Sequence, residues 1–370
     1  MVVPPWYELP PSGYGGIEAV CAALVDKLAA HGHDVVVFGA GRRCATAGTF
    51  VSIMDEPQFR RLGEAMPAAL QAARMAAVLR GSDFDVVHDH SPCGPLVASQ
   101  YPAPTVVTVH GPVEGELGDY FAALGDNVWP VAISQSQRLS RSDLRWAATV
   151  HNAVDTDQFR AAPATDGPVL WLARMSPDKG ADLAIDACRT AGLPLVLAGK
   201  CNEAAEERYF ETVIRPLLHD GVDVVLNADR PTSLRLLTQA RCLIMPVRWQ
   251  EPFGMVIVEA MACGRPVVAL RRGSIPELVR DGVTGWICDH PAELPTALHR
   301  SGELDPADCV AHARSAFDAD LMARRYEAVY RRVVAQSRRP GTRRSVDAAH
   351  VVQALRRPGT PSSAATAADT

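Results

Sequence analysis

The sequence predicts an α/β protein with two Rossmann-like domains, each built on a doubly wound parallel sheet, which face each other across a cleft. Three observations predict this fold. The chain has 370 residues, which is long for one hydrophobic core and typical of two domains. Short β-rich runs alternate with helical stretches, as in doubly wound sheets. This alternation stops at residues 151–168 and then starts again.

The first half begins with a helical stripe and continues with short strands. Apolar residues in 17–33 recur with helical spacing, and Gly32 ends the stripe. Four β-rich runs follow, each leading into a polar or glycine-rich turn, at residues 34–40, 84–90, 105–111 and 129–134. Because strands alternate with helices, we expect a parallel sheet in this half.

Residues 151–168 show no sustained periodicity and form the expected linker. After it, a helix at 178–190 separates the first two of six further strands, predicted at residues 168–174, 193–199, 222–227, 242–247, 266–270 and 284–288. From about residue 291 the pattern is mostly helical. We therefore assign a first domain to residues 1–155, a second domain with terminal helices to 156–335, and a flexible low-complexity tail to 336–370.

Composition excludes several classes of protein. The formal net charge of −5 argues against a general nucleic-acid binder, and no apolar run is long enough to span a bilayer. We see no secretory signal. The nine cysteines are scattered and include no C-x-x-C pair, which favours reduced thiols in a cytoplasmic enzyme over a disulfide framework or a zinc site.

The segment ARMSPDKG at residues 173–180 follows a predicted strand and opens a helix. Arg174 and Lys179 are five residues apart across this turn, so both side chains can reach the space above the strand. Two cations there suit a diphosphate, since Arg binds two oxygens at once and Lys supplies a point charge. A solvated surface pair is the alternative, and the spacing alone does not decide between them.

The segment EPFG lies between the strand at 242–247 and a helix. The unpaired donors of that helix start are expected to be the backbone N–H groups of Phe253, Gly254, Met255 and Val256. Such donors form an anion site. Glu251 at its mouth can accept hydrogen bonds from sugar hydroxyls. Glu259, inside an apolar run, can hold a ribose diol, as acids do in dinucleotide-binding folds. The alternative is an ordinary turn with Glu259 in a salt bridge.

Glycines and histidines are weaker signals. Gly13, Gly15 and Gly16 precede the first helix, where glycine permits close approach of a phosphate, although a plain turn is the better explanation of these glycines taken alone. Three histidines near strand ends, His88, His90 and His110, raise a zinc hypothesis that we disfavour. A histidine that forms a hydrogen bond near the reacting sugar is favoured over a zinc ligand, and a packed, hydrogen-bonded histidine is the alternative for His88. No Walker A loop, G-x-S-x-G elbow, H-E-x-x-H or EF-hand occurs, which disfavours the corresponding enzymes and sensors.

Together, these segments resemble the retaining glycosyltransferases of the GT-B fold, family 4. The E-x7-E motif with its embedded F-G corresponds here to Glu251, Phe253, Gly254 and Glu259, and the R-x4-K motif to Arg174 and Lys179. The segments GYGGIE, VVHDH, HNAVDTDQF and GSIPELVRDGVTGW are similar to further family segments in the same order. The resemblance extends from about residue 4 to residue 335.

The resemblance implies a metal-independent hexosyltransferase that uses a nucleotide-sugar donor, most readily a UDP- or GDP-sugar, and needs no cofactor. It implies that Glu259 holds the ribose, and that Glu251 with the Phe253 and Gly254 amides holds the hexose. Arg174 and Lys179 would stabilise the leaving diphosphate. Gly15 and Gly16 would approach it from the first domain, and His110 would lie by the hexose. The acceptor, a glycan, lipid or small metabolite, would bind first-domain loops at 10–18, 55–80 and 111–120.

Two positions depart from the family pattern. Only Met1, Val2 and Val3 precede the PPW segment, so we expect a short first strand. Asn227 stands where the family often has glycine, in a loop expected near the base. The alternatives are a nucleotide-sugar epimerase of the same fold and a non-catalytic sugar-nucleotide-binding subunit. For the arginine-rich tail we expect a solvated segment, with weak peripheral membrane contact as the alternative.

Overall fold

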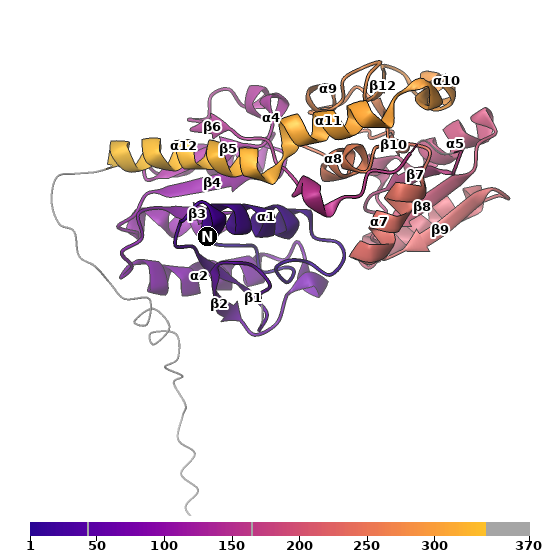
Figure 1. Cartoon of the computed structure of the whole chain (residues 1–370). Helices are drawn as coiled ribbons and strands as arrows, with labels where there is room; N and C mark the ends of the chain where they lie inside the picture. Colours follow the sequence, from indigo (N-terminus) through magenta and orange to yellow (C-terminus); the bar gives the residue numbers. More distant parts are fainter. Residues whose placement is uncertain (43, 164–165, 338–370) are drawn as a thin grey trace, which may run out of the picture.

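The computed structural model describes residues 1–42, 44–163 and 166–337. Two α/β domains lie side by side and are joined by the linker and by the last helices (Figure 1). The fold class expected from the sequence is confirmed, because all strand pairings within both sheets are parallel. The tail from residue 338 onwards, with its arginines, lies outside the described residues.

The first domain contains a sheet in which Val2 joins two ladders. Val2 forms parallel bridges to Phe38 on one side and to Asp89 on the other, and it is fully buried. The expected short first strand is therefore confirmed. One ladder pairs β1 (Val36–Ala40) with β2 (Thr49–Met54); the other runs in the order β3 (Val87–Asp89), β4 (Thr105–Val109), β5 (Val128–Ala132) and β6 (Ala148–Thr149).

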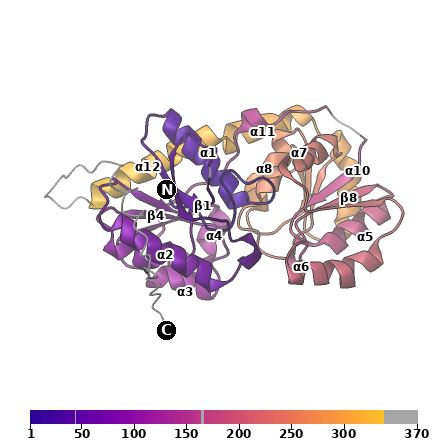
Figure 2. The ribbon, with the colours of Figure 1, turned by 90° about the horizontal axis from the view of Figure 1, so that it is seen from below.

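Helices cover both faces of this sheet. On one face, α1 (Gly16–Ala30) packs with α12 (Ala319–Ser337) around Leu24, Val106 and Tyr326. On the other face, α2 (Ala65–Leu79) packs over Phe38 and Val87. The two short helices α3 (Glu116–Ala123) and α4 (Gln135–Ser140) follow β4 and β5. Figure 2 shows α1 and α12 on the opposite side from α2.

The second domain has a six-stranded parallel sheet in the order β12-β11-β10-β7-β8-β9. The chain builds β7, β8 and β9 outwards and then returns to place β10 on the other side of β7. The order therefore reverses between β7 and β10, and the loops that leave these strands diverge there. The strands are β7 (Val169–Leu172), β8 (Leu195–Gly199), β9 (Val222–Leu226), β10 (Leu243–Met245), β11 (Val267–Leu270) and β12 (Gly285–Cys288).

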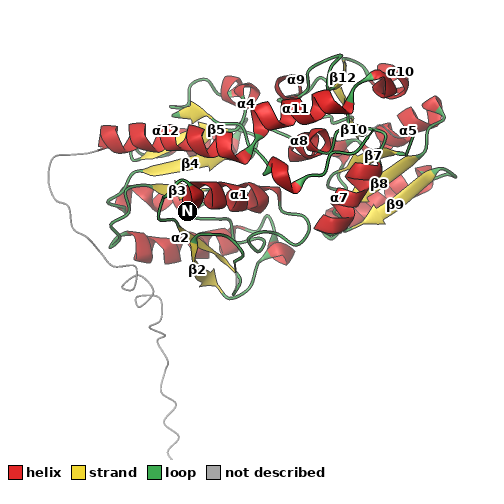
Figure 3. Ribbon diagram, viewed as in Figure 1, coloured by secondary structure: helices red, strands yellow, loops and turns green. Residues whose placement is uncertain are grey.

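Helices cover this sheet (Figure 3), and an apolar cluster packs on each of its faces. The first contains α7 (Arg230–Gln239), α8 (Met255–Ala262) and α11 (Pro306–Phe317), packed around residues such as Ile257 and Met261. The second contains α5 (Ala181–Ala191) and α10 (Leu294–Arg300), packed around Trp171. The short helices α6 (Ala204–Tyr209) and α9 (Ile275–Leu278) lie beside the loops at the strand ends.

The last helix returns to the first domain. Residues 319–335 were expected in the second domain, but Met322, Tyr326 and Val333 of α12 pack into the core of the first domain. Within the described residues, none of the helices combines the length and apolar character required to cross a bilayer. The nine cysteines are all free, and seven of them are buried.

Candidate active site

The candidate site lies where the strand order of the second sheet reverses. Ligands bind at such switch points because neighbouring loops diverge beyond the carboxyl ends of the strands. The loop after β7 carries Arg174 and Lys179, and the loop after β10 carries Glu251. The two loops are tied together, since the Arg248 amide donates to the Asp178 carbonyl at 2.8 Å. A side chain at Gly180 would lie 2.2 Å from the Pro246 carbonyl oxygen, so glycine is required at this contact.

Lys179 and Glu251 form a nearly buried ion pair at this point. The Lys179 Nζ lies 2.6 Å from Oε2 of Glu251, and the two side chains are only 11% and 8% exposed. Trp249 Nε1 donates to the same oxygen at 2.9 Å, and its ring lies 4.3 Å below the ammonium group. The second oxygen of Glu251, Oε1, has no hydrogen-bond partner among the described residues. That oxygen can accept a hydrogen bond from a hydroxyl group of a ligand.

Arg174 is more exposed than Lys179 but faces the first domain. Its Nη2 lies 3.8 Å from Oδ2 of Asp178, which is too long for a firm pair. Desolvation raises the pKa of Tyr14, a first-domain residue, to about 12, although the positive charge of nearby Arg174 acts to lower this pKa. Lys200 also lies near Tyr14, with its Nζ 5.6 Å from the ring centroid. Arg174 therefore stands at the boundary between the two domains.

The α8 helix start faces the first-domain glycines. Gly254 has φ of +89°, which favours glycine, and α8 begins at Met255. Among the described residues, the backbone N–H groups of Gly254, Met255 and Val256 donate to no backbone carbonyl outside α8. On the opposite side, a Cβ at Gly16 would lie 3.8 Å from the Met255 side chain. Gly15, with φ of +151°, caps α1 directly before it. The starts of α1 and α8 therefore lie close to each other, one from each domain.

Glu259 is not exposed to bulk solvent. Its side chain is 12% exposed, and Oε1 accepts a hydrogen bond from Nη1 of Arg230 at 2.6 Å. The Arg230 amide donates to the carbonyl of Ser12 in the first domain at 3.1 Å. Arg230 was not identified from the sequence, because it lies 29 residues before Glu259, on another helix.

Asn227 adopts the left-handed conformation for which glycine is more common. Its φ is +54°, and its side chain accepts from the Cys201 amide at 2.8 Å and donates to the Cys201 carbonyl at 3.0 Å. Asn tolerates this region better than most residues. The side chain thus ties the loop after β9 to the loop after β8, which a glycine could not do.

The three histidines form a neutral group in the first domain, in which His88 and His90 are buried and His110 is partly buried. Nδ1 of His88 lies 2.6 Å from the Tyr330 hydroxyl and its Nε2 lies 2.7 Å from Thr108 Oγ1, so His88 is packed and hydrogen-bonded, which was the alternative for this residue. His90 Nδ1 lies 2.9 Å from His110 Nε2. Burial lowers the pKa of His110 to about 3. Within the described residues, no cluster of three or more metal-ligating side chains occurs.

Glu277 connects the domains at a second place. Its carboxylate, on α9, accepts hydrogen bonds from the Gln135 and Ser136 amides at the start of α4, at 2.8 and 2.6 Å. His151 of the linker lies 3.0 Å away. Burial opposes ionisation of Glu277, but these bonds prevail and lower its pKa. Glu277 lies in the segment at residues 273–286 that resembles the family, but its contact with the start of α4 was not predicted.

Two family models match consecutive parts of the chain. Residues 14–158 match "Glycosyltransferase Family 4", and residues 155–301 match "Glycosyl transferases group 1". Both motifs of the second domain lie within the second match. The chain belongs to the family 4 glycosyltransferases of the GT-B fold.

Curated relatives of this glycosyltransferase match it over most of their length. It is 28% identical to the D-inositol 3-phosphate glycosyltransferase of Acidothermus cellulolyticus, over 91% of the chain and 90% of the relative. It is 29% identical to the alpha-maltose-1-phosphate synthase of Mycobacterium tuberculosis, over 78% of the chain and 84% of the relative. These relatives and the two family matches support a glycosyltransferase activity for this chain.

Solved structures share the fold of this glycosyltransferase. Sucrose-phosphate synthase from Thermosynechococcus elongatus has a TM-score of 0.71 at 18% identity and covers 90% of this chain and 99% of its own. Anabaena HepE, in complex with UDP and glucose, has a TM-score of 0.65 at 20% identity and covers 86% and 96%. At these identities the likeness shows the fold alone.

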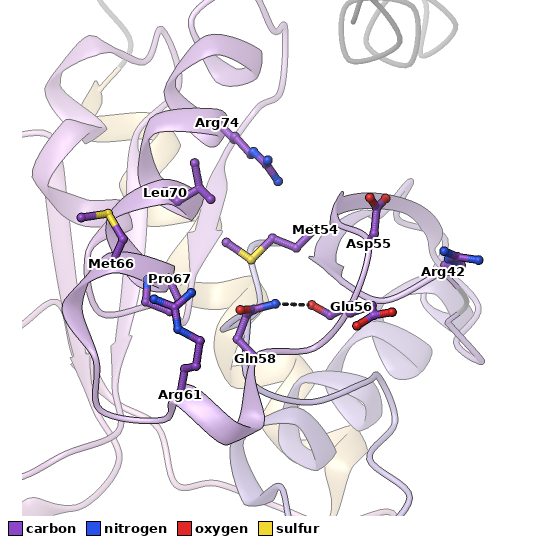
Figure 4. Close-up of a pocket in the computed structure, with 10 residues that line it drawn as sticks. All are labelled: Arg42, Met54, Asp55, Glu56, Gln58, Arg61, Met66, Pro67, Leu70 and Arg74. Carbon is purple, nitrogen blue, oxygen red and sulfur yellow. Dashed lines mark hydrogen bonds between the residues drawn. The ribbon is translucent and has the colours of Figure 1, made fainter.

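The glycosyltransferase has a separate pocket of about 410 Å³ in its first domain (Figure 4). Met66, Leu70 and Arg74 of α2 form one wall, and the loop after β2 forms another. Arg61 of this loop pairs with Glu64, whereas Arg42 has no ion pair among the described residues. The pocket is lined by Arg42, Met54, Asp55, Glu56, Gln58, Arg61, Met66, Pro67, Leu70 and Arg74.

Proposed function

We propose that the enzyme transfers a hexose from a nucleoside-diphosphate sugar to an acceptor hydroxyl, with retention of anomeric configuration and without a metal ion. The observation that carries the proposal is the Lys179–Glu251 pair, with 2.6 Å between Nζ and Oε2, directly before the helix start at Gly254. A cation, a carboxylate with one free oxygen and unpaired amides are the groups that a sugar diphosphate requires.

The diphosphate binds between the cations and the helix start. Lys179 supplies a point charge and Arg174 a fork of donors, while the amides of Gly254, Met255 and Val256 and the dipole of α8 face the same anion. When a phosphate reaches Lys179, the ammonium group exchanges part of its interaction with Glu251 for the phosphate oxygens. Glu251 then accepts hydroxyls of the hexose through Oε1.

Charge develops on the diphosphate as the glycosidic bond breaks, and these groups stabilise it because they are already oriented. The acceptor hydroxyl attacks on the face that the diphosphate leaves, and its proton passes to a phosphate oxygen. The carbon–oxygen bond to the leaving group breaks as the new bond to the acceptor forms, so the configuration is retained. Since the protein supplies the positive charge itself, the reaction requires no metal.

Different observations support our proposals for the donor and for the acceptor. HepE was solved with UDP-glucose, which supports a UDP-sugar as the first donor to test, with a GDP-sugar as the alternative. We place the acceptor in the first-domain pocket, within the loops expected to bind it. Three arginines line this pocket against the carboxylates of Asp55 and Glu56, and this small excess of positive charge favours an anionic group. Two relatives are named for phosphate-bearing sugars or polyols. We also propose a cytoplasmic location, supported by the free, mostly buried cysteines.

The test is to incubate the purified enzyme with UDP- or GDP-glucose and a panel of phosphorylated and neutral polyols, in the presence of EDTA. We expect an α-configured product by NMR from an α-configured donor, and activity unaffected by EDTA. A β-configured product would refute retention, and complete loss of activity with EDTA would refute the metal-free reaction. An epimeric nucleotide sugar formed without an acceptor would instead indicate an epimerase.

A further inference from the structure

A carboxylate that grips a ribose diol must be held in one orientation, because both hydroxyls have to reach it. Glu259 is on α8, surrounded by apolar residues, and its side chain is 12% exposed. A charged group at such a position is costly unless it has a partner. In the described part of the chain, Arg230 is the only residue that forms an ion pair or side-chain hydrogen bond with Glu259.

The geometry of this pair leaves Glu259 available for a ligand. Arg230 uses Nη1 to hold Oε1 at 2.6 Å, and Oε2 has no hydrogen-bond partner among the described residues. A carboxylate has about four acceptor positions, so a bond from one arginine leaves enough for two hydroxyls. Hydrogen bonds to charged groups are also stronger than those between neutral groups.

Arg230 is itself fixed from three directions. It is the first residue of α7, after the N-cap Asp229, whose side chain accepts from the Thr232 amide. Its guanidinium lies 5.2 Å from the centre of the Phe159 ring in the linker. Its amide donates to the carbonyl of Ser12, and the neighbouring Gly13 approaches the Ala228 carbonyl and Asp229. The first domain, the linker and α7 therefore all determine where the guanidinium lies.

We infer that Arg230 is a positioning residue that holds the Glu259 carboxylate toward the ribose diol of the donor nucleotide and so makes the site selective for ribonucleotides. The inference rests on the proposed function. It adds a residue that acts through Glu259, and the contact with Ser12 makes this selectivity depend on the first domain. Arg230 does not itself touch the diphosphate or the hexose.

The measurement is the ratio of dissociation constants for a nucleoside diphosphate and its 2′-deoxy counterpart, by calorimetry, for UDP, GDP and ADP. We expect the wild-type enzyme to prefer the ribonucleotide by roughly tenfold or more, as one hydrogen bond to a charged group provides. Arg230→Ala should reduce this preference to about the level of Glu259→Gln, and Arg230→Lys should restore part of it. A ratio is informative because a general loss of fold or affinity raises both dissociation constants together.

Arg235→Ala is the matched control, since Arg235 is on the same helix, is exposed and contacts Gln239 rather than Glu259. We expect it to keep the wild-type ratio. A wild-type ratio in Arg230→Ala, together with its loss in Glu259→Gln, would overturn the inference while leaving the proposed function intact. If the wild-type enzyme binds none of the three nucleotides, the proposed function fails and this inference fails with it.

Discussion

Lys179 and Glu251 are 72 residues apart in the sequence, yet their charged atoms lie 2.6 Å apart beneath the start of α8. The contact exists because the strand order reverses between β7 and β10, so the loops that follow these strands share one crevice. An ion pair with side chains only 11% and 8% exposed is costly to desolvate, and its partners must compensate. Trp249 supplies part of that compensation through its indole N–H and its ring.

Replacing Lys179 tests the proposed charge stabilisation. Lys179→Ala should lower kcat by about 10² or more, because a preoriented cation at the leaving group acts mainly in the transition state. Arg174→Ala should act in the same direction. Steady-state kinetics with the identified donor measures both. Arg189→Ala, which removes an exposed cation on α5 paired with Asp186, is the control and should retain wild-type rates. Unchanged turnover in both Lys179 and Arg174 variants would contradict the assignment.

Glu277 should make the stability of the protein depend on pH. Its pKa in the folded protein is lowered below its ordinary value of 4.5 by His151 and two amides, despite the opposing effect of burial. The stabilisation is therefore present above about pH 4.5 and is lost as the pH falls through the lowered pKa. Glu277→Gln should reduce the free energy of unfolding at pH 7 by about 1–3 kcal/mol, as expected for hydrogen bonds to a charged group.

Chemical denaturation of wild type and Glu277→Gln at pH 7, 5 and 3.5 measures this effect. The difference between the two proteins should shrink at the lowest pH, because wild-type Glu277 is increasingly protonated there. A difference that stays constant across this range would show that the carboxylate charge does not stabilise the contact between the domains.

Gly273 supports the active-site loop from the segment after β11. Its φ is +54°, and a Cβ there would lie 2.3 Å from the carbonyl oxygen and 2.4 Å from the amide nitrogen of Glu251. Gly273→Ala must therefore displace the backbone of Glu251, and we expect a loss of activity of about tenfold or more, since small displacements of a positioned group are costly. Gly81→Ala is the control, because a Cβ at Gly81 meets nothing within 4 Å. Wild-type kcat/KM in Gly273→Ala would refute the supporting role.

Much of the fold could be predicted because periodicity and turn residues are local signals. Apolar runs such as 105–111 and 222–227 became β4 and β9. β2 and β6 were not predicted. β6 has only two residues, and β2 is an edge strand in which exposed and buried residues mix. The return of α12 to the first domain could not be predicted either, because an amphipathic stripe does not specify which sheet it covers.

The candidate site likewise contains residues that could be predicted from the sequence and residues that could not. Arg174, Lys179, Glu251 and Glu259 are residues whose types and spacing indicate a chemistry, and the structure places Lys179 against Glu251 just before α8, the helix that carries Glu259. Arg230, the partner of Glu259, could not be predicted, and neither could the bridge that Glu277 forms between the domains, because both contacts join residues far apart in the sequence. The roles of the site residues in catalysis stay predictions.

The most direct test of the central claim compares the binding of UDP and UMP, or of GDP and GMP if guanine is the preferred base, to the wild-type enzyme and to Lys179→Ala. The claim is that the space between Lys179, Arg174 and the start of α8 binds a diphosphate. Calorimetry should show that the wild type binds the diphosphate roughly tenfold or more tightly than the monophosphate, and that Lys179→Ala loses most of this advantage. Equal affinity for both nucleotides in the wild type, or an unchanged advantage in Lys179→Ala, would contradict it.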